Sequence, residues 1–393
     1  MLKTNLFYTK LGGFVKNQNP ELTTFIHASD LHLGSHQYRN DFRADDFIKA
    51  FQQILEISIS SQSDFIILGG DVFTSLEMLP GKLVKIIDIL KEFKVYTNES
   101  IPIIAIEGNH DIRRFSRGVK FSQRGQSWLK LLSSLGLVIL LDGDLDAPAS
   151  SVYLPYDYTF KKGGKIRRKN VIIYGNHYIG ENPEDYIQKI GEAIEKEKDS
   201  FCVLLQHFGI AGQMEHVPGI KLNKLYPLRE KVDYLALGHY HLQFILDNWI
   251  YNPGSSEAVC SIDSKFKRGI FIVKIKGNEH FIKEVYPIKL LNRNHIWKTI
   301  HLPHPFKNKS ELINFIINKL KSELSYLDNN HNNLSNPKVP ILYLVLKGKK
   351  PLLRRFNEKE LKTELLKILP IVEARIYQKY SEYTKSLNQY LYL

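Results

Sequence analysis

Cysteine is nearly absent from this 393-residue chain, which contains only Cys202 and Cys260. Two cysteines exclude a disulfide framework and a zinc site built mainly from thiolates, and they fit a reducing compartment. No apolar run approaches the ~20 residues of a membrane span. The N-terminal stretch has neither the sustained apolar core nor the cleavage site of a secretory signal. We therefore expect a protein that is not secreted and has no membrane partner, cytoplasmic in a prokaryote or nuclear in a eukaryote.

Acidic residues are also scarce relative to basic ones. The chain has 54 Lys and Arg against 41 Asp and Glu, a net charge of +13 and a pI near 9.3. After position 300 the counts are 16 basic and 8 acidic residues. Such an excess favours a polyanionic partner such as nucleic acid, although a lysine-rich solvated surface explains the same balance.

Strand-like and helix-like segments alternate along the first two thirds of the chain. Buried strands are expected at 24–29, 65–68 and 102–106, separated by amphipathic helices at 41–61 and 80–93. This alternation predicts βαβ units around a largely parallel layer. A further helix is expected at 124–135, and later strands at 137–141, 170–174, 201–206, 232–237, 243–252, 269–275 and 280–286.

The hairpin-like spacing of the last strands indicates a second, partly antiparallel sheet. We therefore predict an α/β fold, a four-layer α/β/β/α sandwich over 23–289 that follows an N-terminal extension over 1–22. From 290 to 393 the pattern changes, and we predict a small basic α+β domain. Its strands are expected at 297–302, 339–346 and 371–378, and its helices at 310–327 and 357–369.

Five short motifs rich in histidine and carboxylate each follow one of the expected strands. The carboxyl ends of strands in open α/β sheets form ligand sites, so we expect the five motifs to meet in one cluster. Taken singly, each motif is more simply explained as a turn with a surface side chain. The motifs are Asp30-Leu31-His32, Gly70-Asp71, Gly108-Asn109-His110-Asp111, Gln206-His207 and Gly238-His239-Tyr240-His241.

The donors in these motifs are oxygen and imidazole nitrogen, without thiolate. Such a set suits two divalent cations, with Mn²⁺ favoured and Mg²⁺ or Fe²⁺ possible. Asn109 offers a neutral oxygen, and His110 beside it is placed to serve a substrate. Asp111 is predicted to hold the His110 ring in one tautomer by a hydrogen bond from outside the metal ligands. His177 imitates the Gly-Asn-His pattern but lacks the Asp that follows it, and we interpret it as a loop residue.

The series of motifs over residues 24–260 resembles the calcineurin-like metallophosphoesterase superfamily. Within it, the segments HASDLHLG, QHFG and GHYH, followed by Asn252-Pro-Gly-Ser255, are similar to the double-strand-break repair nucleases of the meiotic-recombination-eleven and SbcD type. This resemblance implies a metallophosphoesterase nuclease domain followed by a DNA-binding cap domain. It implies 3′–5′ exonuclease activity on duplex ends, single-strand endonuclease activity, or both.

The resemblance also assigns roles to individual residues. One cation would be held by Asp30, His32, Asp71 and His241. The other would be held by Asp71, Asn109, His207 and His239, so that Asp71 bridges the two. The catalytic residue His110 would contact the scissile phosphate rather than a metal. Many relatives carry a second pocket histidine three residues after the bridging Asp; here Thr74 stands in its place, which leaves the balance of exonuclease and endonuclease activity open.

Basic side chains follow the motif that contains His110. We expect DNA contacts from five of them, which are Arg113, Arg114, Arg117, Lys120 and Arg124. A second basic run at 161–169 is equally compatible with a DNA-touching hairpin and with a mobile loop. No base-reading motif is apparent, which fits a protein that binds the DNA backbone.

The resemblance implies two protein partners. The first is a second copy of the chain, in a homodimer built on the helices that follow Asp71 and His110. These helices contain Leu83, Ile86, Ile87, Leu90, Trp128, Leu131, Leu132 and Leu135. The second is a coiled-coil ATPase of the SMC type, for which at most residues 380–393 are left in this chain. Two alternatives stay open: a phosphoesterase for small phosphodiesters or phosphomonoesters, and a DNA-end scaffold with weak nuclease activity.

Overall fold

The computed structural model describes most of the chain, in two compact units. It describes residues 7, 14, 16, 22–112, 127–303, 306–327, 334–348 and 357–380, and the backbone of 115–116 and 119–120. The first unit runs to Gln37 and again from Phe47 to Leu290; the second combines Tyr38–Asp46 with the chain from Leu291 onward. Within the described residues, no helix is long and apolar enough to cross a membrane.

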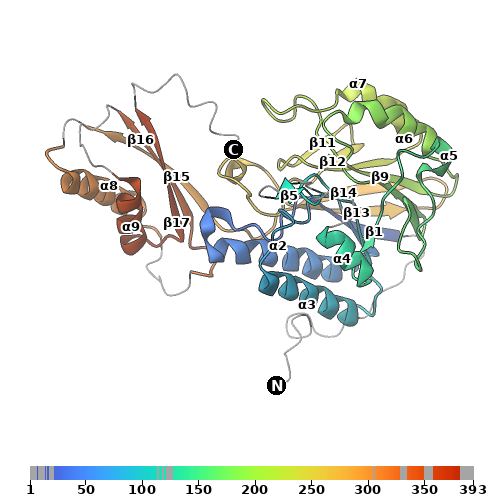
Figure 1. Cartoon of the computed structure of the whole chain (residues 1–393), viewed down its shortest axis with the longest axis horizontal. Helices are drawn as coiled ribbons and strands as arrows, with labels where there is room; N and C mark the ends of the chain where they lie inside the picture. Colours follow the sequence, from blue (N-terminus) through green and yellow to red (C-terminus); the bar gives the residue numbers. More distant parts are fainter. Residues whose placement is uncertain are drawn as a thin grey trace. The chain divides into compact units, whose positions relative to one another are not determined.

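Two six-stranded sheets form the centre of the first unit (Figure 1). The first has the order β14-β13-β1-β2-β3-β6, with β1 (Leu22–Ala28), β2 (Phe65–Leu68), β3 (Ile103–Ala105), β6 (Ile139–Leu140), β13 (Ile270–Lys276) and β14 (Ile282–Ile288). The second has the order β11-β12-β10-β9-β8-β7, with β7 (Lys165–Arg168), β8 (Val171–Gly175), β9 (Phe201–His207), β10 (Tyr234–Gly238), β11 (Phe244–Leu246) and β12 (Ile250–Asn252). The central pairs of both sheets run parallel, and antiparallel strands lie toward the edges.

Alternating side chains on these strands produce three cores. In β1, Phe25 packs between the two sheets, whereas its neighbour Ile26 packs against helices. In β9, Val203 packs between the sheets and Leu204 lies in the helical core of the other side. A period of two residues in buried strands places successive side chains on opposite faces. The predicted four-layer α/β/β/α order is therefore confirmed.

Helices cover the two outer faces, with α2 and α3 on one side of the sheets and α6 and α7 on the other (Figure 1). Pro80 at the first position of α3 fixes the backbone angle needed to begin the helix, and Ser127 caps α4 by accepting a hydrogen bond from the backbone of Lys130. The helices are α2 (Asp41–Ser60), α3 (Pro80–Tyr96), α4 (Trp128–Ser134), α5 (Ala149–Val152), α6 (Ile187–Ala193) and α7 (Leu222–Leu225).

Some local expectations differ from the structure. The single strand predicted over 243–252 is a hairpin of β11 and β12, because residues 247–249 turn the chain with Asp247 and Asn248 at positive φ. Part of the basic run at 161–169 forms the edge strand β7, which pairs with β8. Helix α6 had no counterpart in the sequence-based expectations.

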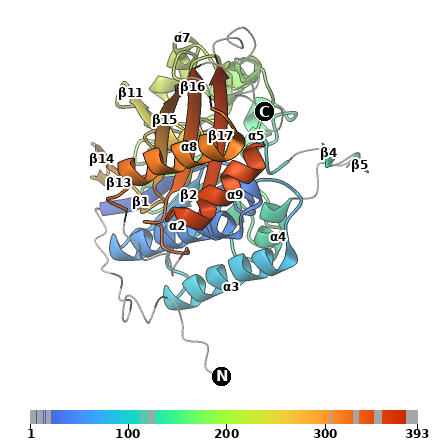
Figure 2. The ribbon, with the colours of Figure 1, turned by 90° about the vertical axis from the view of Figure 1, so that its left-hand side faces the viewer.

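The second unit is a βαβαβ arrangement with a three-stranded parallel sheet of order β15-β16-β17. Helices α8 and α9 lie over one face of this sheet (Figure 2). The sequence predicted the elements and an α+β class; the strands are instead parallel, and each helix connects two of them. The elements are β15 (His295–Leu302), α8 (Lys309–Glu323), β16 (Ile341–Gly348), α9 (Glu358–Ile368) and β17 (Glu373–Tyr380).

A buried ion pair joins the two parts of the second unit. The Asp46 carboxylate, at the end of the early segment, accepts hydrogen bonds from Nε and Nη2 of Arg293 at 2.6 and 2.9 Å. Arg43 donates to the same carboxylate at 2.7 Å. All three side chains are almost fully buried, and a bidentate arginine–carboxylate pair is the arrangement that best offsets such burial.

Candidate metal centre

The motifs predicted from the sequence converge at the carboxyl ends of five strands. Asp30 follows β1, Asp71 follows β2, Asn109 follows β3, His207 ends β9, and His239 follows β10. Both sheets of the first unit contribute, so the cluster lies where their central strands end together. This is the edge at which parallel α/β sheets present ligand sites.

The backbone at four of the candidate ligands has positive φ. The values are 50° for Asp30, 47° for His32, 48° for Asp71 and 92° for His239. Residues with side chains adopt this region at a cost, and such positions concentrate at functional sites. The site also requires a glycine at position 108. A Cβ on this residue would lie 2.3 Å from the backbone nitrogen and from Oδ1 of Asp71.

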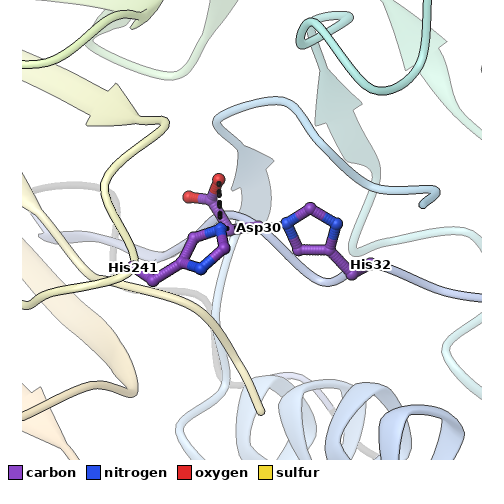
Figure 3. Close-up of side chains that lie close together, drawn as sticks. All are labelled: Asp30, His32 and His241. Atoms are coloured by element: carbon purple, nitrogen blue, oxygen red, sulfur yellow. Dashed lines mark hydrogen bonds and ion pairs between the residues drawn. The ribbon is translucent and has the colours of Figure 1, made fainter. Parts of the chain in front are cut away.

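Asp30, His32 and His241 form the first group of donors (Figure 3). Their ligand atoms lie within 4.8 Å of one another. Nε2 of His32 is 3.1 Å from Nε2 of His241, which in turn is 4.0 Å from Oδ1 of Asp30. Asp30 also accepts hydrogen bonds from Ser29 Oγ at 2.5 Å and from the backbone nitrogen of His239. Asp30 and His32 are buried.

Asp71 connects this group to a second one. Its Oδ2 lies 3.9 Å from Nε2 of His32 and 3.4 Å from Nε2 of His207. Oδ1 of Asn109 is 3.1 Å from Nε2 of His207 and 3.2 Å from Nδ1 of His239. The carboxylate therefore lies between the two sets of donors, the position that the family resemblance implies for a bridging ligand.

Three of the histidine rings are oriented by a hydrogen bond that Nδ1 makes to an oxygen acceptor. Nδ1 of His207 donates to the carbonyl of Gly69 at 2.7 Å, and Nδ1 of His110 donates to the carbonyl of Thr74 at 2.9 Å. Because a carbonyl only accepts, each bond selects the tautomer in which Nδ1 carries the proton. Nε2 of His207 then lies 3.4 Å from Oδ2 of Asp71, and Nε2 of His110 lies 4.0 Å from it.

The third ring reveals a residue that the sequence did not single out. Nδ1 of His241 lies 2.8 Å from Oδ2 of Asp263, a buried residue of the 3₁₀ helix Asp263–Lys265. The same oxygen accepts hydrogen bonds from the backbone nitrogens of Val259 and Cys260. Carboxylates that bind the far nitrogen of a metal-ligating histidine fix its ring and raise its basicity. Asp263 follows no strand and belongs to no motif, so no sequence signal pointed to it.

Asp111 does not have the role predicted for it. Its carboxylate accepts hydrogen bonds from the backbone nitrogens of Phe73 at 2.8 Å and Gly108 at 2.9 Å, and from Val72 at 3.2 Å. These three donors lie in the loops around Asp71, so Asp111 holds the backbone of the site together. The prediction that it orients the ring of His110 is wrong, because the carbonyl of Thr74 does so.

The charges of the cluster are strongly coupled. Burial raises the pKa of Asp30 to about 6, against the lowering effect of His207 and His241. Burial alone would lower the pKa values of these two histidines, but Asp71 raises that of His207 and Asp263 raises that of His241, each to about 9. Positive charge is therefore stabilised between buried carboxylates in this cluster.

The same donors fit divalent cations. Nδ1 of His32 is buried without a hydrogen-bond partner among the described residues, and its Nε2 contacts another imidazole nitrogen. Without a metal these two nitrogens share a proton, and a divalent cation would replace that proton and take both nitrogens as ligands. Carboxylate, amide and imidazole donors without thiolate suit Mn²⁺, Mg²⁺ or Fe²⁺ better than softer metals.

The remaining predicted residues fall outside the cluster or outside the described residues. Four arginines expected to contact DNA, at 113, 114, 117 and 124, lie outside the described residues, as does the side chain of Lys120. His177 belongs to none of the candidate ligand groups and instead bonds Asp142 at 2.6 Å, which agrees with its interpretation as a loop residue. In the run at 161–169, Lys165, Arg167 and Lys169 form ion pairs with acidic side chains.

Comparison with known proteins gives one family. Residues 23–243 match the calcineurin-like phosphoesterase family. Three relatives carry the name DNA double-strand break repair protein Mre11. That of Archaeoglobus fulgidus is 29% identical over 59% of this chain and 50% of its own length. That of Sulfurisphaera tokodaii is 26% identical over 83% and 74%, and that of Methanococcus maripaludis is 25% identical over 92% and 90%. The chain thus spans about half the length of the first of these and most of the other two.

Proposed function

Since this chain belongs to the calcineurin-like phosphoesterase family, we propose that it is a Mn²⁺-dependent DNA nuclease that processes the ends of double-strand breaks. It would act as a 3′–5′ exonuclease on duplex ends, as an endonuclease on single strands, or as both. The observation that carries the proposal is the similarity to the Mre11 protein of Methanococcus maripaludis, which covers 92% of this chain. A match of that extent includes the second unit as well as the candidate metal centre.

We assign the ligands as the geometry and the family suggest. Asp30, His32 and His241 would hold one cation, and Asn109, His207 and His239 the other, with Asp71 shared between them. Two cations in such a site bind the scissile phosphate, lower the pKa of a water molecule and offset the charge of in-line displacement. The protein fixes the ring of His207 through the carbonyl of Gly69 and the ring of His241 through Asp263. Asp111 holds the backbone of the loops around Asp71.

His110 is proposed to act on the substrate. Its side chain is 25% exposed, whereas those of His32 and His207 are buried. Nδ1 is bonded to the carbonyl of Thr74, so we assign Nε2 the contact with a phosphate oxygen or the protonation of the leaving oxygen. Nε2 lies 4.0 Å from Oδ2 of Asp71, and His110 can also be grouped with His32 and Asp71 as a donor. Its removal must therefore be tested for metal loss as well as for lost cleavage.

Nuclease assays separate this proposal from its alternatives. Labelled linear duplex, hairpin and single-stranded DNA are incubated with the protein and Mn²⁺, in parallel with a small chromogenic phosphodiester. We expect cleavage of DNA by the wild type and by His177→Ala, the control for a histidine outside the cluster, and a loss of at least ~100-fold in His110→Ala. Intact DNA with rapid turnover of the small diester would favour a small-molecule phosphoesterase, and DNA binding without cleavage would favour a scaffold.

Metal analysis tests the ligand assignment independently of activity. Elemental analysis after gel filtration in Mn²⁺ should find two ions per chain in the wild type and in His110→Ala. Asp71→Ala should lose both ions, because it removes the donor between the two groups. Two ions retained by Asp71→Ala would refute the bridge, and metal lost from His110→Ala would make that residue a ligand.

We also propose that the protein forms homodimers through α3. Leu79, Val84 and Val95 on or beside this helix are more than half exposed although apolar. Ile86 and Leu90, which were expected at the interface, are buried in the core, so we assign the contact to the three exposed side chains. Sedimentation at several concentrations should show a dimer that Val84→Asp weakens. A coiled-coil ATPase remains a proposed partner; of the segment expected to bind it, 380–393, all but Tyr380 lies outside the described residues.

A further inference from the structure

A cavity of about 410 Å³ lies at the end of the sheets opposite the candidate metal centre. It is lined by Phe201, the first residue of β9, and by Phe281, the residue before β14, whereas the candidate ligand His207 is the last residue of β9. The seven residues of β9 span about 20 Å in an extended strand, so the cavity is separate from the metal centre. Its volume is typical of a site for a small molecule.

Lys283 places a positive charge in the wall of this cavity. Its Nζ donates hydrogen bonds to the backbone carbonyls of Asp233 at 2.9 Å and Asn248 at 2.8 Å. It forms no ion pair with any residue that the structure describes, and the Asp233 carboxylate is bonded instead by Lys196 and by the backbone nitrogen of Cys202. Burial lowers the pKa of Lys283 to about 8, because a partly buried charge loses hydration. An anion in the cavity would offset this loss.

Aromatic rings lie around the same ammonium group. Nζ of Lys283 is 5.0 Å from the ring centroid of Tyr251, 5.8 Å from that of Tyr234 and 6.0 Å from that of Phe201. Phe201 in turn packs edge to face against Phe281, with centroids 5.8 Å apart. Phe281 is only partly buried and lines the cavity, so part of its ring is accessible there. The cavity therefore offers a flat apolar surface beside a cationic group.

The rim of the cavity adds further polar groups. Lys198 and His280 line it, are exposed, and form no ion pair within the described part of the chain. Glu279 is exposed on the same rim. Because the Asp233 carboxylate is already bonded, two lysines face a single free carboxylate, and this balance favours an anionic ligand. Glu279 can accept a hydrogen bond from an amino or hydroxyl group elsewhere on that ligand.

We propose that this cavity binds a flat organic phosphate of the nucleoside monophosphate class, with the phosphate on Lys283 and Lys198 and the ring on Phe281. An ammonium group has three N–H donors. The carbonyls of Asp233 and Asn248 use two of those on Lys283, which leaves one for a phosphate oxygen. Charge-assisted hydrogen bonds of this kind are about twice as strong as neutral ones, and bases stack on aromatic side chains. The site does not depend on the proposed nuclease function, because none of these residues belongs to the metal centre.

Calorimetric titration of the full chain in EDTA, with thymidine monophosphate and with inorganic phosphate, tests the site without any cleavage. We expect the nucleotide to bind about tenfold more tightly than phosphate, because its base adds the contact with Phe281. Phe281→Leu, which keeps an apolar side chain, should lower the affinity for the nucleotide to about that for phosphate. Equal affinities of the wild type for both ligands would overturn the ring contact, and binding of neither would overturn the proposal.

Proton uptake distinguishes a direct contact of Lys283 from a structural effect. Asp233 raises and Arg229 lowers the pKa of this lysine, both by less than burial does, and a bound phosphate should raise it further. At pH 8.5 a phosphate monoester has already lost its second proton, so binding should take up protons and the measured enthalpy should vary with the ionisation enthalpy of the buffer. Lys283→Gln should lose about tenfold in affinity and lose this uptake. A wild type that takes up no proton would overturn the contact.

Exposed lysines supply a variant that leaves the fold intact and a matched control. Lys198→Gln should weaken nucleotide binding by about threefold and keep the proton uptake, whereas Lys91→Gln, which removes an exposed lysine of α3 outside the cavity, should bind like the wild type. An equal loss in both variants would show non-specific attraction and refute the site. A 5′-phosphorylated oligothymidylate that binds more tightly than the mononucleotide would overturn the assignment to free nucleotides and make the cavity a site for strand ends.

Discussion

Removing the carboxylate of Asp263 tests how far the metal centre depends on residues that do not contact metal. Oδ2 of Asp263 is 2.8 Å from Nδ1 of His241 and also accepts from two backbone nitrogens. Asp263→Asn keeps an oxygen at this position and removes only the charge. Asp263→Ala removes the acceptor as well, and so frees the His241 ring to rotate and to exchange tautomers.

The expected loss of metal affinity can be estimated from other proteins in which the hydrogen-bond partner of a metal-ligating histidine is removed. Loss of a hydrogen-bonded partner of a metal-ligating histidine costs about 10–100-fold in metal affinity, or about 1.4–2.8 kcal/mol at 1.4 kcal/mol per factor of ten. We expect a loss in this range for Asp263→Ala and a smaller one, of about threefold to tenfold, for Asp263→Asn. The smaller loss reflects the decreased basicity of His241, since its hydrogen bond is retained.

The assay is calorimetric titration of metal-free protein with Mn²⁺, with thermal unfolding of each variant measured alongside. Asp142→Asn is the matched control, because Asp142 bonds Nδ1 of His177, which lies in none of the donor groups. Wild-type affinity in Asp263→Ala, or a fall in Asp142→Asn as large as that in Asp263→Ala, would refute the reasoning. A change in unfolding temperature without a change in affinity would assign Asp263 a purely structural role.

Three further predictions concern stability and backbone placement. Asp46→Ala should lower the free energy of unfolding by about 3–5 kcal/mol in chemical denaturation, because it leaves the buried guanidinium of Arg293 without its carboxylate; a loss below about 1 kcal/mol would contradict this. Burial lowers the pKa of His27 to about 3, so stability should fall as pH decreases below about 6.5, by about 2 kcal/mol at pH 5, and His27→Gln should flatten this dependence. Gly108→Ala should displace Asp71, whose backbone lies 2.3 Å from the added Cβ, and its metal content should fall; full metal occupancy would show that the loop adjusts.

The candidate ligands could be predicted from the sequence because each follows a strand that the hydrophobic pattern identifies. Buried strands such as β1 and β9 have continuous apolar runs, and the residue after the last apolar one is at the ligand edge. Locating the ends of these strands was therefore enough to predict that Asp30, Asp71 and His207 lie at this edge. Each motif alone is weak, but five motifs that each follow a strand together indicate one site.

What the sequence could not supply was the set of hydrogen-bond partners. Asp111 lies next to His110, and proximity in the chain suggested a bond between their side chains. The backbone nitrogens around Asp71 compete for the same carboxylate, and their positions depend on loops with no periodic pattern. Asp263 lies 22 residues after His241, in a 3₁₀ turn, and only the folded chain brings the two together.

The parallel sheet of the second unit shows a different limit. Its strands and helices were located within a few residues, because amphipathic helices and apolar strands leave distinct patterns. The expected elements alternate between strand and helix, and this alternation is the signal that predicted parallel βαβ units in the first unit. The same signal favoured a parallel sheet here, so the α+β assignment gave it too little weight.

The second unit is discontinuous along the gene, because it takes Tyr38–Asp46 from the first fifty codons and the rest from codon 291 onward. Asp46 is nearly inaccessible and binds Arg293 through two oxygens. A recombination event that replaced everything after codon 290 would leave this carboxylate facing an unrelated partner. Substitutions in Tyr38–Asp46 and in the chain after Leu291 are thus expected to be correlated in evolution. The second unit cannot be replaced by exchanging one continuous segment of the gene.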